Sequence, residues 1–268
     1  MMRSLWTAAS GMIAQQTNVD TIANNIANVN TNGYKTQRAE FKTLLYQTLQ
    51  EKTTSANGER KPVSAQVGLG TRTAAIDSIY TQGEMIATES DTAFGINGKG
   101  FFSIRAADGN TYYTRDGNFV WAVGNNGMTL STADGYSVLD SNGQPITLPA
   151  GVPASSVQFS PDGVITYQVN GRNVTRTFGL YQFNNPTGLM KISQNLLAVT
   201  EASGPALSEA TTAGLTRSTV MNKYLEGSNV QVADEMVDLI IAQRAYELNS
   251  KAIQAADEMM GQANQLRR

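Results

Sequence analysis

Two residue types are missing from this chain of 268 residues, which contains neither histidine nor cysteine. Without histidine there is no Ser-His-Asp triad, no imidazole base and no histidine-bearing zinc site. Without cysteine there is no thiol nucleophile, iron–sulfur cluster or disulfide framework. We therefore expect no metal site and no cofactor, and any catalysis would depend on carboxylates, lysine, tyrosine or hydroxyl groups.

Charge is also scarce. Charged residues make up 16% of the chain and the formal net charge is −2, whereas globular proteins average about 25% charged residues. A chain so close to neutral has no strong field for nucleic acid or an anionic membrane surface. Arg115, Arg172 and Arg176 are scattered and form no basic aromatic patch. We expect no nucleic-acid partner.

Long apolar runs are absent too. The stretch Leu239–Ala242 is among the longest, far below the roughly 20 residues that span a bilayer. The N-terminal residues lack the apolar core of a secretory signal peptide. We expect no membrane insertion and no cleaved signal, which taken alone favours the cytoplasm.

The N-terminal region has the apolar periodicity of a long helix. Between Leu5 and Val29 there is no proline and the only glycine is Gly11. Apolar residues recur every seven positions, which places them on one side of a helix. This predicted seam consists of Leu5, Met12, Val19 and Ile26. Gly33 follows at a position where a left-handed glycine can end the helix.

The C-terminal region repeats this pattern. Ser228 is a candidate N-cap, and Gln231 three residues later completes a capping box. A second apolar seam follows, with residues seven apart: Val232, Leu239, Tyr246, Ile253 and Met260. Further apolar residues widen this face: Val237, Ile241, Ala245, Leu248, Ala252, Ala256 and Met259. Early acidic residues (Asp234, Glu235, Asp238) and late basic ones (Arg267, Arg268) suit the helix dipole.

The first helix carries almost no charge. From Met1 to Tyr34 only Arg3 and Asp20 are charged, whereas a solvated helix face normally carries Glu, Lys and Arg. A single seam also buries little surface for so long an ordered segment. We infer a helix enclosed by several neighbours, which are other copies or related subunits. The alternative is a monomer whose terminal helices form an antiparallel hairpin packed on the β domain in the middle of the chain.

The middle of the chain reads as β-structure. Short alternating or aromatic runs such as Gly100–Ile104 and Ile165–Val169 are separated by turn signals. These Asn-Gly and Asp-Gly pairs have their glycines at positions 98, 109, 117, 127, 135, 143, 163 and 171. Their spacing predicts an antiparallel meander or a barrel-like domain. Residues 50–70 resemble a linker.

Possible catalytic and ligand sites in this middle region find little support. Gly95–Gly100 has neither the order nor the following helix of a phosphate loop, so it reads as a turn into a strand. Asp140–Gly143 is too short for a calcium loop. Paired acids for glycoside hydrolysis are the remaining option, but each candidate directly precedes a glycine and suits a turn. These candidates are Asp108, Asp116, Asp134 and Asp162.

Several motifs resemble those of bacterial flagellar rod and hook proteins. At the N-terminus these are Ser4–Met12, Ala23–Lys35 and Glu40–Gln47. The middle contributes Gly98–Phe102, Tyr113–Gly117 and Asp134–Tyr136, and the C-terminal part Glu226–Val230, Glu235–Val237 and Gln243–Lys251. Length and both ends are most similar to the distal-rod members, which carry an added segment where this chain has Leu49–Gln66. At Asp91–Ile96 the chain departs from the Asp-hydrophobic-Ala-Ile run usual in similar proteins.

The resemblance implies an α+β fold in which the N- and C-terminal helices pair as a coiled coil and the centre is an antiparallel all-β domain. The expected terminal helical domain comprises residues 1–35 and 228–268. Connector segments cover residues 36–92 and 206–227, and the β domain covers residues 93–205.

The function implied is that of a non-enzymatic subunit of the flagellar basal-body rod. Such subunits polymerise helically with themselves into a hollow shaft that transmits torque, with the helices innermost. Other rod and hook proteins, the flagellar export apparatus and surrounding ring proteins are the implied partners. Export without a cleaved signal peptide would place the rod in the periplasm or cell wall. Alternatives are another hook-basal-body paralogue, a carboxylate-based wall hydrolase, and a monomeric adhesion or binding module.

The expected assembly surface combines the two seams with the family motifs. An amide row, Asn24, Asn25 and Asn28, is expected to make contacts between helices. Junctions with neighbours are expected at Gly33, Tyr34, Lys35, Gln243 and Arg244.

Overall fold

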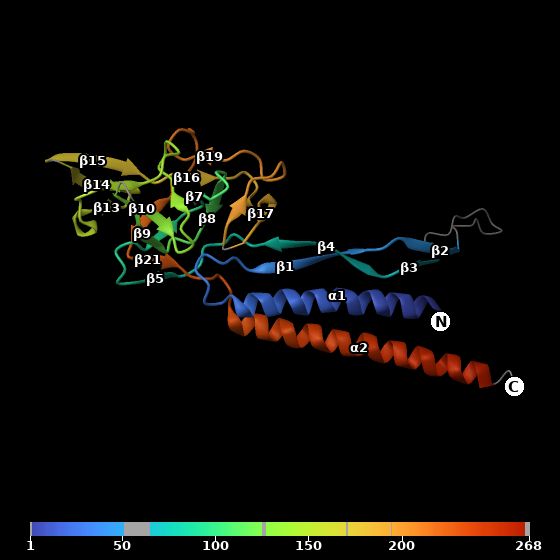
Figure 1. Cartoon of the computed structure of the whole chain (residues 1–268). Helices are drawn as coiled ribbons and strands as arrows, with labels where there is room; N and C mark the ends of the chain where they lie inside the picture. Colours follow the sequence, from blue (N-terminus) through green and yellow to red (C-terminus); the bar gives the residue numbers. More distant parts are fainter. Residues whose placement is uncertain (1, 51–64, 125–126, 170, 194, 266–268) are drawn as a thin grey trace. The chain divides into compact units, whose positions relative to one another are not determined.

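The computed structural model describes residues 2–50, 65–124, 127–169, 171–193 and 195–265 (Figure 1). Most of the linker-like stretch predicted at residues 50–70 lies outside these ranges, as do Asn126, Asn170, Arg267 and Arg268. The chain forms two compact units. The first consists of Met1–Ala27, Gln37–Ser78 and Gln231–Arg268, and the second of residues 28–36 and Ile79–Val230.

The first unit contains the two long helices, α1 (Met2–Ala27) and α2 (Val232–Gln265). They lie side by side and run antiparallel (Figure 1). A Cβ placed on Gly11 of α1 would lie 2.9 Å from the side-chain nitrogen of Asn249 in α2. At the other end of the pair, Asn25 of α1 meets Glu235 of α2.

Two antiparallel strand pairs complete this unit. Strand β1 (Gln37–Thr43) pairs with β4 (Thr71–Ser78), and β2 (Tyr46–Gln50) pairs with β3 (Ala65–Gly68). Helix α1 packs on β1 and β4, where the Thr71 amide donates to the Ser10 hydroxyl at 3.3 Å. One side of α1 is therefore covered by strands and another by α2.

Both helices are found where the sequence predicts them, with shifted boundaries. Helix α1 ends at Ala27 rather than Val29, and Gly33 adopts the left-handed φ of +68°. Ser228 is not the N-cap of α2. Its hydroxyl accepts from the Val230 amide, and the helix begins at Val232, with the Gln231 carbonyl accepting from the Glu235 amide. The capping-box prediction was wrong because the chain is still in a turn at Ser228.

The second unit is built from antiparallel strands. Its described residues form a ten-stranded sheet with the order β12-β10-β11-β7-β8-β18-β17, to which β9, β16 and β19 attach. A three-stranded sheet, β13-β14-β15, and the pairs β20–β6 and β21–β5 complete it. The α+β prediction with a central antiparallel β region is therefore confirmed.

The elements of this unit have the following bounds: β5 (Met85–Ala87), β6 (Phe94–Asn97), β7 (Phe101–Arg105), β8 (Thr111–Thr114), β9 (Phe119–Gly124), β10 (Gly127–Thr132), β11 (Ser137–Val138), β12 (Thr147–Pro149), the 3-10 helix η1 (Ala154–Ser156), β13 (Gln158–Ser160), β14 (Val164–Val169), β15 (Arg172–Thr177), β16 (Leu180–Gln182), the 3-10 helix η2 (Pro186–Gly188), β17 (Met190–Lys191), β18 (Leu197–Ala198), β19 (Leu207–Ser208), β20 (Thr219–Asn222) and β21 (Tyr224–Glu226).

The core of the second unit is aromatic. Phe102 packs edge-to-face against Phe119 and Phe178, with ring centroids 5.2 and 5.5 Å apart. Phe94 joins the same cluster, and all four rings are buried. A second cluster contains Phe101, Tyr113, Phe183, Leu189 and Leu197. Edge-to-face rings bury large apolar areas in specific geometries, so this unit has a well-defined interior.

Candidate functional site

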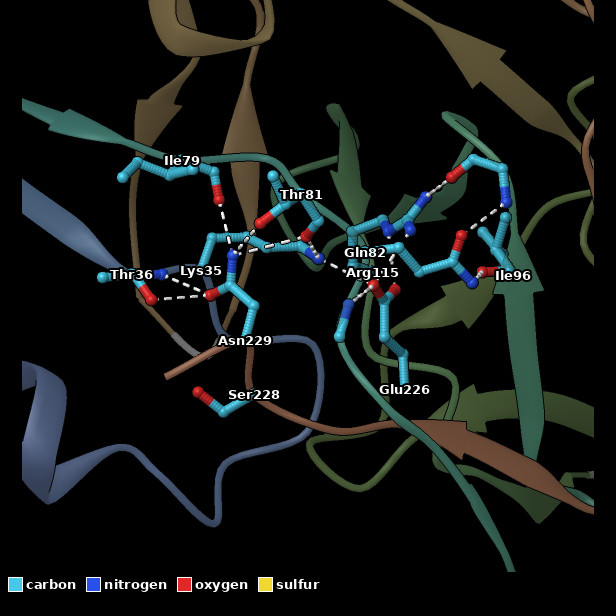
Figure 2. A network of polar contacts seen from close by, with 12 residues as sticks. Lys35, Thr36, Ile79, Thr81, Gln82, Ile96, Arg115, Glu226, Ser228 and Asn229 are labelled. Carbon is cyan, nitrogen blue, oxygen red and sulfur yellow. Dashed lines mark hydrogen bonds and ion pairs between the residues drawn. The ribbon is translucent and has the colours of Figure 1, made fainter. Parts of the chain in front are cut away.

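Glu226, the last residue of β21, is the centre of a buried ion network (Figure 2). Its carboxylate accepts from Lys35 Nζ at 2.6 Å, from Arg115 Nε at 2.8 Å and Nη2 at 3.0 Å, and from the Gly83 amide at 3.0 Å. The Glu226 side chain is fully buried, and those of Lys35 and Arg115 are about 5% exposed. Lys35, Arg115 and Glu226 form what we call the buried triad.

The electrostatics of the triad follow from two cations sharing one carboxylate. Burial by itself raises the pKa of Glu226, but the Arg115 and Lys35 charges and their hydrogen bonds hold that pKa below its usual 4.5. Burial lowers the pKa of Lys35, and Glu226 only partly offsets this. Removing one member of such a set leaves a buried charge without its partner, which is costly.

Asn229 makes a second set of contacts beside the triad (Figure 2). Its side-chain oxygen accepts from the Thr36 amide at 2.7 Å and from the Thr36 hydroxyl at 2.8 Å. Its nitrogen donates to the Ile79 carbonyl at 2.9 Å and to the Thr81 hydroxyl at 2.8 Å. The side-chain amide of Asn229 therefore links its own segment to two others, at Thr36 and at Ile79 to Thr81, by hydrogen bonds that strand pairing would otherwise supply.

Gly33 fits against the triad through its backbone. Its amide donates to the Glu226 carbonyl at 2.7 Å. A Cβ at Gly33 would lie 2.8 Å from both the Arg115 carbonyl carbon and the Asp116 nitrogen. The left-handed φ and the close approach both require glycine here. Within the second unit, the network thus fixes the two chain segments, 28–36 and 226–230, that continue toward the helices.

The seam residues predicted on the helices lie partly covered in the single chain. Leu5, Met12, Val19 and Ile26 of α1 are half-buried, as are Leu239, Ile253 and Met260 of α2. Val232 and Tyr246 are about 40% exposed. Most residues of both seams are thus partly covered within the single chain.

The predicted widening row of α2 is largely uncovered. Among the described residues of α2, only Ala242 and Ala256 are buried. Large apolar side chains are exposed along this helix: Val232, Met236, Val237, Ile240, Ile241, Leu248 and Met259. On α1, Trp6 is 73% exposed and Ile13 66%. Monomeric proteins rarely display such contiguous apolar surface, which marks interaction sites.

The amide row is divided between the two units. Asn25, 1% exposed, donates from its side chain to the Gln37 carbonyl at 2.8 Å and to the Glu235 carboxylate at 3.1 Å. It also accepts from the Gln37 amide, so it joins α1, β1 and α2 within one chain. Asn24 is exposed, and Asn28 accepts from the Thr31 hydroxyl in the turn after α1.

The remaining predicted junction residues take different positions. Lys35 is in the buried triad, and Tyr34 is half-buried beside it in sequence. Gln243 and Arg244 are exposed on α2, where Arg244 pairs with Glu247 at 2.8 Å. These two groups belong to different units and are described separately.

Comparisons with known proteins agree with these features. Residues 5–35 match the model of the flagella basal body rod protein, and residues 221–266 match the flagellar basal body rod FlgEFG protein C-terminal. Residues 95–167 match the flagellar hook protein FlgE/F/G D1 domain. The chain is 44% identical to the flagellar basal-body rod protein FlgG of Borreliella burgdorferi over all of both chains.

The chain belongs to the FlgG family of flagellar basal-body rod proteins. It is also 42% identical to FlgG of Caulobacter vibrioides, covering 99% of this chain and 100% of that one. Identity to the flagellar hook-basal body complex protein FlhP of Bacillus subtilis is 31%, over all of both chains. The resemblance seen in the terminal motifs is confirmed, and the family is the FlgG group.

FlgG-family membership makes the chain a structural subunit of the flagellar basal body and not an enzyme. The wall-hydrolase alternative has no support. Two of the candidate acids, Asp108 and Asp116, accept from the amides of Asn110 and Asn118 at 3.0 Å, as expected for turn residues.

Across the described ranges, no group of three or more acidic residues is placed to hold a metal ion. Neither helix is long and apolar enough over its described residues to cross a membrane.

Sequence reasoning missed the most connected residues of this FlgG-family chain. Arg115 was interpreted as a scattered charge, and all three of Arg115, Glu226 and Asn229 were otherwise noted only as parts of motifs. One available signal was the scarcity of charge. In such a chain, a lone arginine or glutamate next to a turn is a candidate for a buried ion pair.

Proposed function

We propose that the chain polymerises through its two helices into the distal part of the flagellar rod, a helical hollow shaft that transmits torque toward the hook. In this proposal α1 and α2 form an antiparallel coiled coil in each subunit. The observation that carries the proposal is the uncovered apolar surface of α2. A second copy of the chain is the partner whose helices offer the matching surface.

The spacing of covered residues on α2 supports the coiled-coil pairing. Glu235, Leu239, Ala242, Asn249, Ile253, Ala256 and Met260 are buried or half-buried. With Tyr246, their positions alternate in steps of three and four, which is the seam of a left-handed coiled coil. The exposed residues Val237, Ile241 and Leu248 lie off that seam. They remain available for other helices after α1 and α2 have paired.

The assignment of the chain's segments is part of the same proposal. The terminal segments 1–35 and 228–268 form the assembly domain with the seam, amide-row and junction residues in its contacts. Residues 93–205 form the β domain, joined to it by residues 36–92 and 206–227. Other rod and hook proteins are the neighbours at the two ends of the polymer. Ring proteins surround it.

The place of assembly is proposed from the same family membership. The FlgG relatives are named as basal-body rod proteins, and the basal body is where the chain belongs. We infer that the flagellar export apparatus delivers the unfolded chain, without a cleaved signal peptide, to the periplasm or cell wall. The polymer forms there.

The test changes one exposed residue of α2. Ile241→Asp places a charge on a surface that is 60% exposed in the chain and buried in the proposed rod. We expect motility and rod assembly to be lost while urea unfolding of the second unit is unchanged, because burying an unpaired carboxylate is costly.

Ile241→Leu is the matched control, because it keeps the apolar character and size of the side chain. We expect it to retain assembly and motility. Intact rods and normal swimming in the Ile241→Asp strain would show that this helix face is not an assembly surface. Basal bodies are examined by electron microscopy, and secretion of the variant chain is measured so that failed export is recognised.

A further inference from the structure

A cavity of about 200 Å³ in the second unit borders the buried triad. Lys35 and Arg115 line it, with Lys99, Tyr80 and Asn184. The cavity's walls therefore carry three cationic residues. Among the described residues that line it there is no carboxylate.

The triad does not neutralise its own charge. It holds two cations and one carboxylate, all at least nine-tenths buried. Glu226 already accepts from four donors. Two other carboxylates among the described residues of the second unit are buried, and neither lines the cavity: Glu209 accepts from Gln182 and Ser218, and Asp140 pairs with Arg176. Asp116 accepts from the Asn118 amide in its own turn. One excess positive charge thus faces the cavity, and buried charges require partners.

Hydrogen-bond donors also remain unused at the cavity. Lys35 has three ammonium hydrogens and donates to Thr81 and Glu226. The guanidinium of Arg115 has five hydrogens, of which four are used, by Glu226 and the Gly98 and Gly100 carbonyls. The Tyr80 hydroxyl has no hydrogen-bond partner among the described residues, and burial raises its pKa to about 12. All three groups are hydrogen-bond donors, and an oxyanion is a ligand that accepts hydrogen bonds through its oxygen atoms.

We propose that this cavity binds an oxyanion, a carboxylate or a phosphate, which neutralises the excess charge of the triad. The volume is several times the roughly 30 Å³ share of a water molecule, which leaves room for a phosphate group or the end of an acidic side chain. Phe101 and Phe183 also line the cavity. The anion has two possible sources: a free ion, or an Asp or Glu of a neighbouring copy. The second source rests on the proposed assembly, and the first does not.

The first arm of the test uses the full-length monomer and inorganic phosphate. Thermal unfolding is followed over increasing phosphate, with sodium chloride at matched ionic strength. We expect Tm to rise with the logarithm of the phosphate concentration above Kd, by about 5 °C at a hundredfold excess over Kd. The logarithmic form matters because phosphate also stabilises proteins by exclusion from the surface, and that effect grows roughly in proportion to the phosphate concentration.

Two variants locate the effect. Tyr80→Phe removes a hydroxyl and Lys99→Met removes an exposed charge without touching the triad, and we expect each to weaken phosphate binding about threefold to fivefold. Lys223→Met is the control, because Lys223 pairs with Asp91 and does not line the cavity. If phosphate raised the Tm of the natural chain and of all three variants equally, the anion would bind elsewhere and the proposal would be wrong.

The second arm tests a carboxylate from a neighbouring copy. Purified rods and monomers are treated with a carbodiimide, which joins a lysine amine to a carboxylate, and the linked peptides are identified by mass spectrometry. A Lys99 link to an Asp or Glu in rods and not in monomers supports the neighbour as the source. Saturable phosphate binding without this link supports the free ion. If neither is observed, the cavity binds no oxyanion and the proposal is wrong, whether or not rods assemble.

Discussion

Glu226 is the residue on which the order of the second unit depends most. It pairs with two cations from segments far apart in the sequence, and its carbonyl also accepts from Gly33. Buried ion pairs contribute little net stability compared with apolar residues, but breaking one is costly because a charge is left unpaired. The consequence is sensitivity: conservative changes at Glu226 have large effects.

We expect Glu226→Gln to lower the free energy of unfolding of the second unit by about 3–5 kcal/mol. Glu201→Gln, at an exposed position, is the matched control and should change it little. Urea unfolding monitored by circular dichroism measures both. A loss below about 1 kcal/mol for Glu226→Gln would contradict the stabilising role given to the triad.

The stability difference between the natural chain and the Glu226→Gln variant should depend on pH. The pKa of Glu226 is held below 4.5 in the folded state, so its contribution is fully present above pH 4.5 and is lost as pH falls through the folded pKa. The difference in stability between the natural chain and Glu226→Gln should therefore shrink in acid below that value. A difference that stays constant down to pH 2 would argue against ionised Glu226 as the source.

The variant Gly33→Ala tests the close packing of the Gly33 backbone against Arg115 of the triad. Alanine in the left-handed conformation costs roughly 1–2 kcal/mol, and here its Cβ would also meet backbone atoms of Arg115 and Asp116. Gly109→Ala is the control, since Gly109 has a φ of +80° but no atom within 4 Å of a Cβ. We expect a Tm loss for Gly33→Ala that clearly exceeds that of Gly109→Ala. Equal losses would mean that only the backbone conformation matters.

At the scale of elements, periodicity predicted the helices and the turn signals predicted the β region. Seven-residue repeats located α1 and α2 to within a few residues, because a helix displays its pattern locally. The turn at Gly95–Gly100 does lead from β6 into β7. Strands β1 and β4 lie in a region expected to be a connector and were not located. Their paired residues are 28 to 41 positions apart, and such pairing leaves no local pattern.

The site was harder to predict than the elements, for the same physical reason. Lys35 was identified through a motif, but its partner Glu226 is separated from it by 191 residues. The Ser228 capping box was convincing locally, yet the neighbouring Asn229 is held by Thr36, Ile79 and Thr81. Long-range contacts at Asn229 thus hold the chain in a turn where the local pattern predicts a helix start.

For the whole molecule, the two units differ in how much of their apolar surface is covered. The second unit has a continuous aromatic core, whereas α2 has only two buried residues along its described length. Segments with little buried surface open at low cost. The unpolymerised chain should therefore be stable in one unit and labile in the other.

Limited proteolysis of the dilute monomer tests this difference. We expect trypsin to cut after Arg244 and Lys251, both exposed on α2, well before it cuts after Lys35 or Arg115. Mass spectrometry over a time course identifies the order. In assembled rods the α2 sites should be protected. Monomer helices that resist trypsin as long as the β unit would favour a self-sufficient helical hairpin.

The 191-residue separation between Lys35 and Glu226 also has a consequence in time. When a chain emerges with its N-terminus first, Lys35 becomes available for folding early and Glu226 late. Strands β5 and β6 likewise cannot pair until their partners β21 and β20, which come much later in the sequence, are available. Because non-local contacts must be closed before they stabilise a fold, the second unit cannot complete its structure until the chain has passed residue 226. The position of one carboxylate near the C-terminus thus delays folding of this unit until most of the chain has emerged.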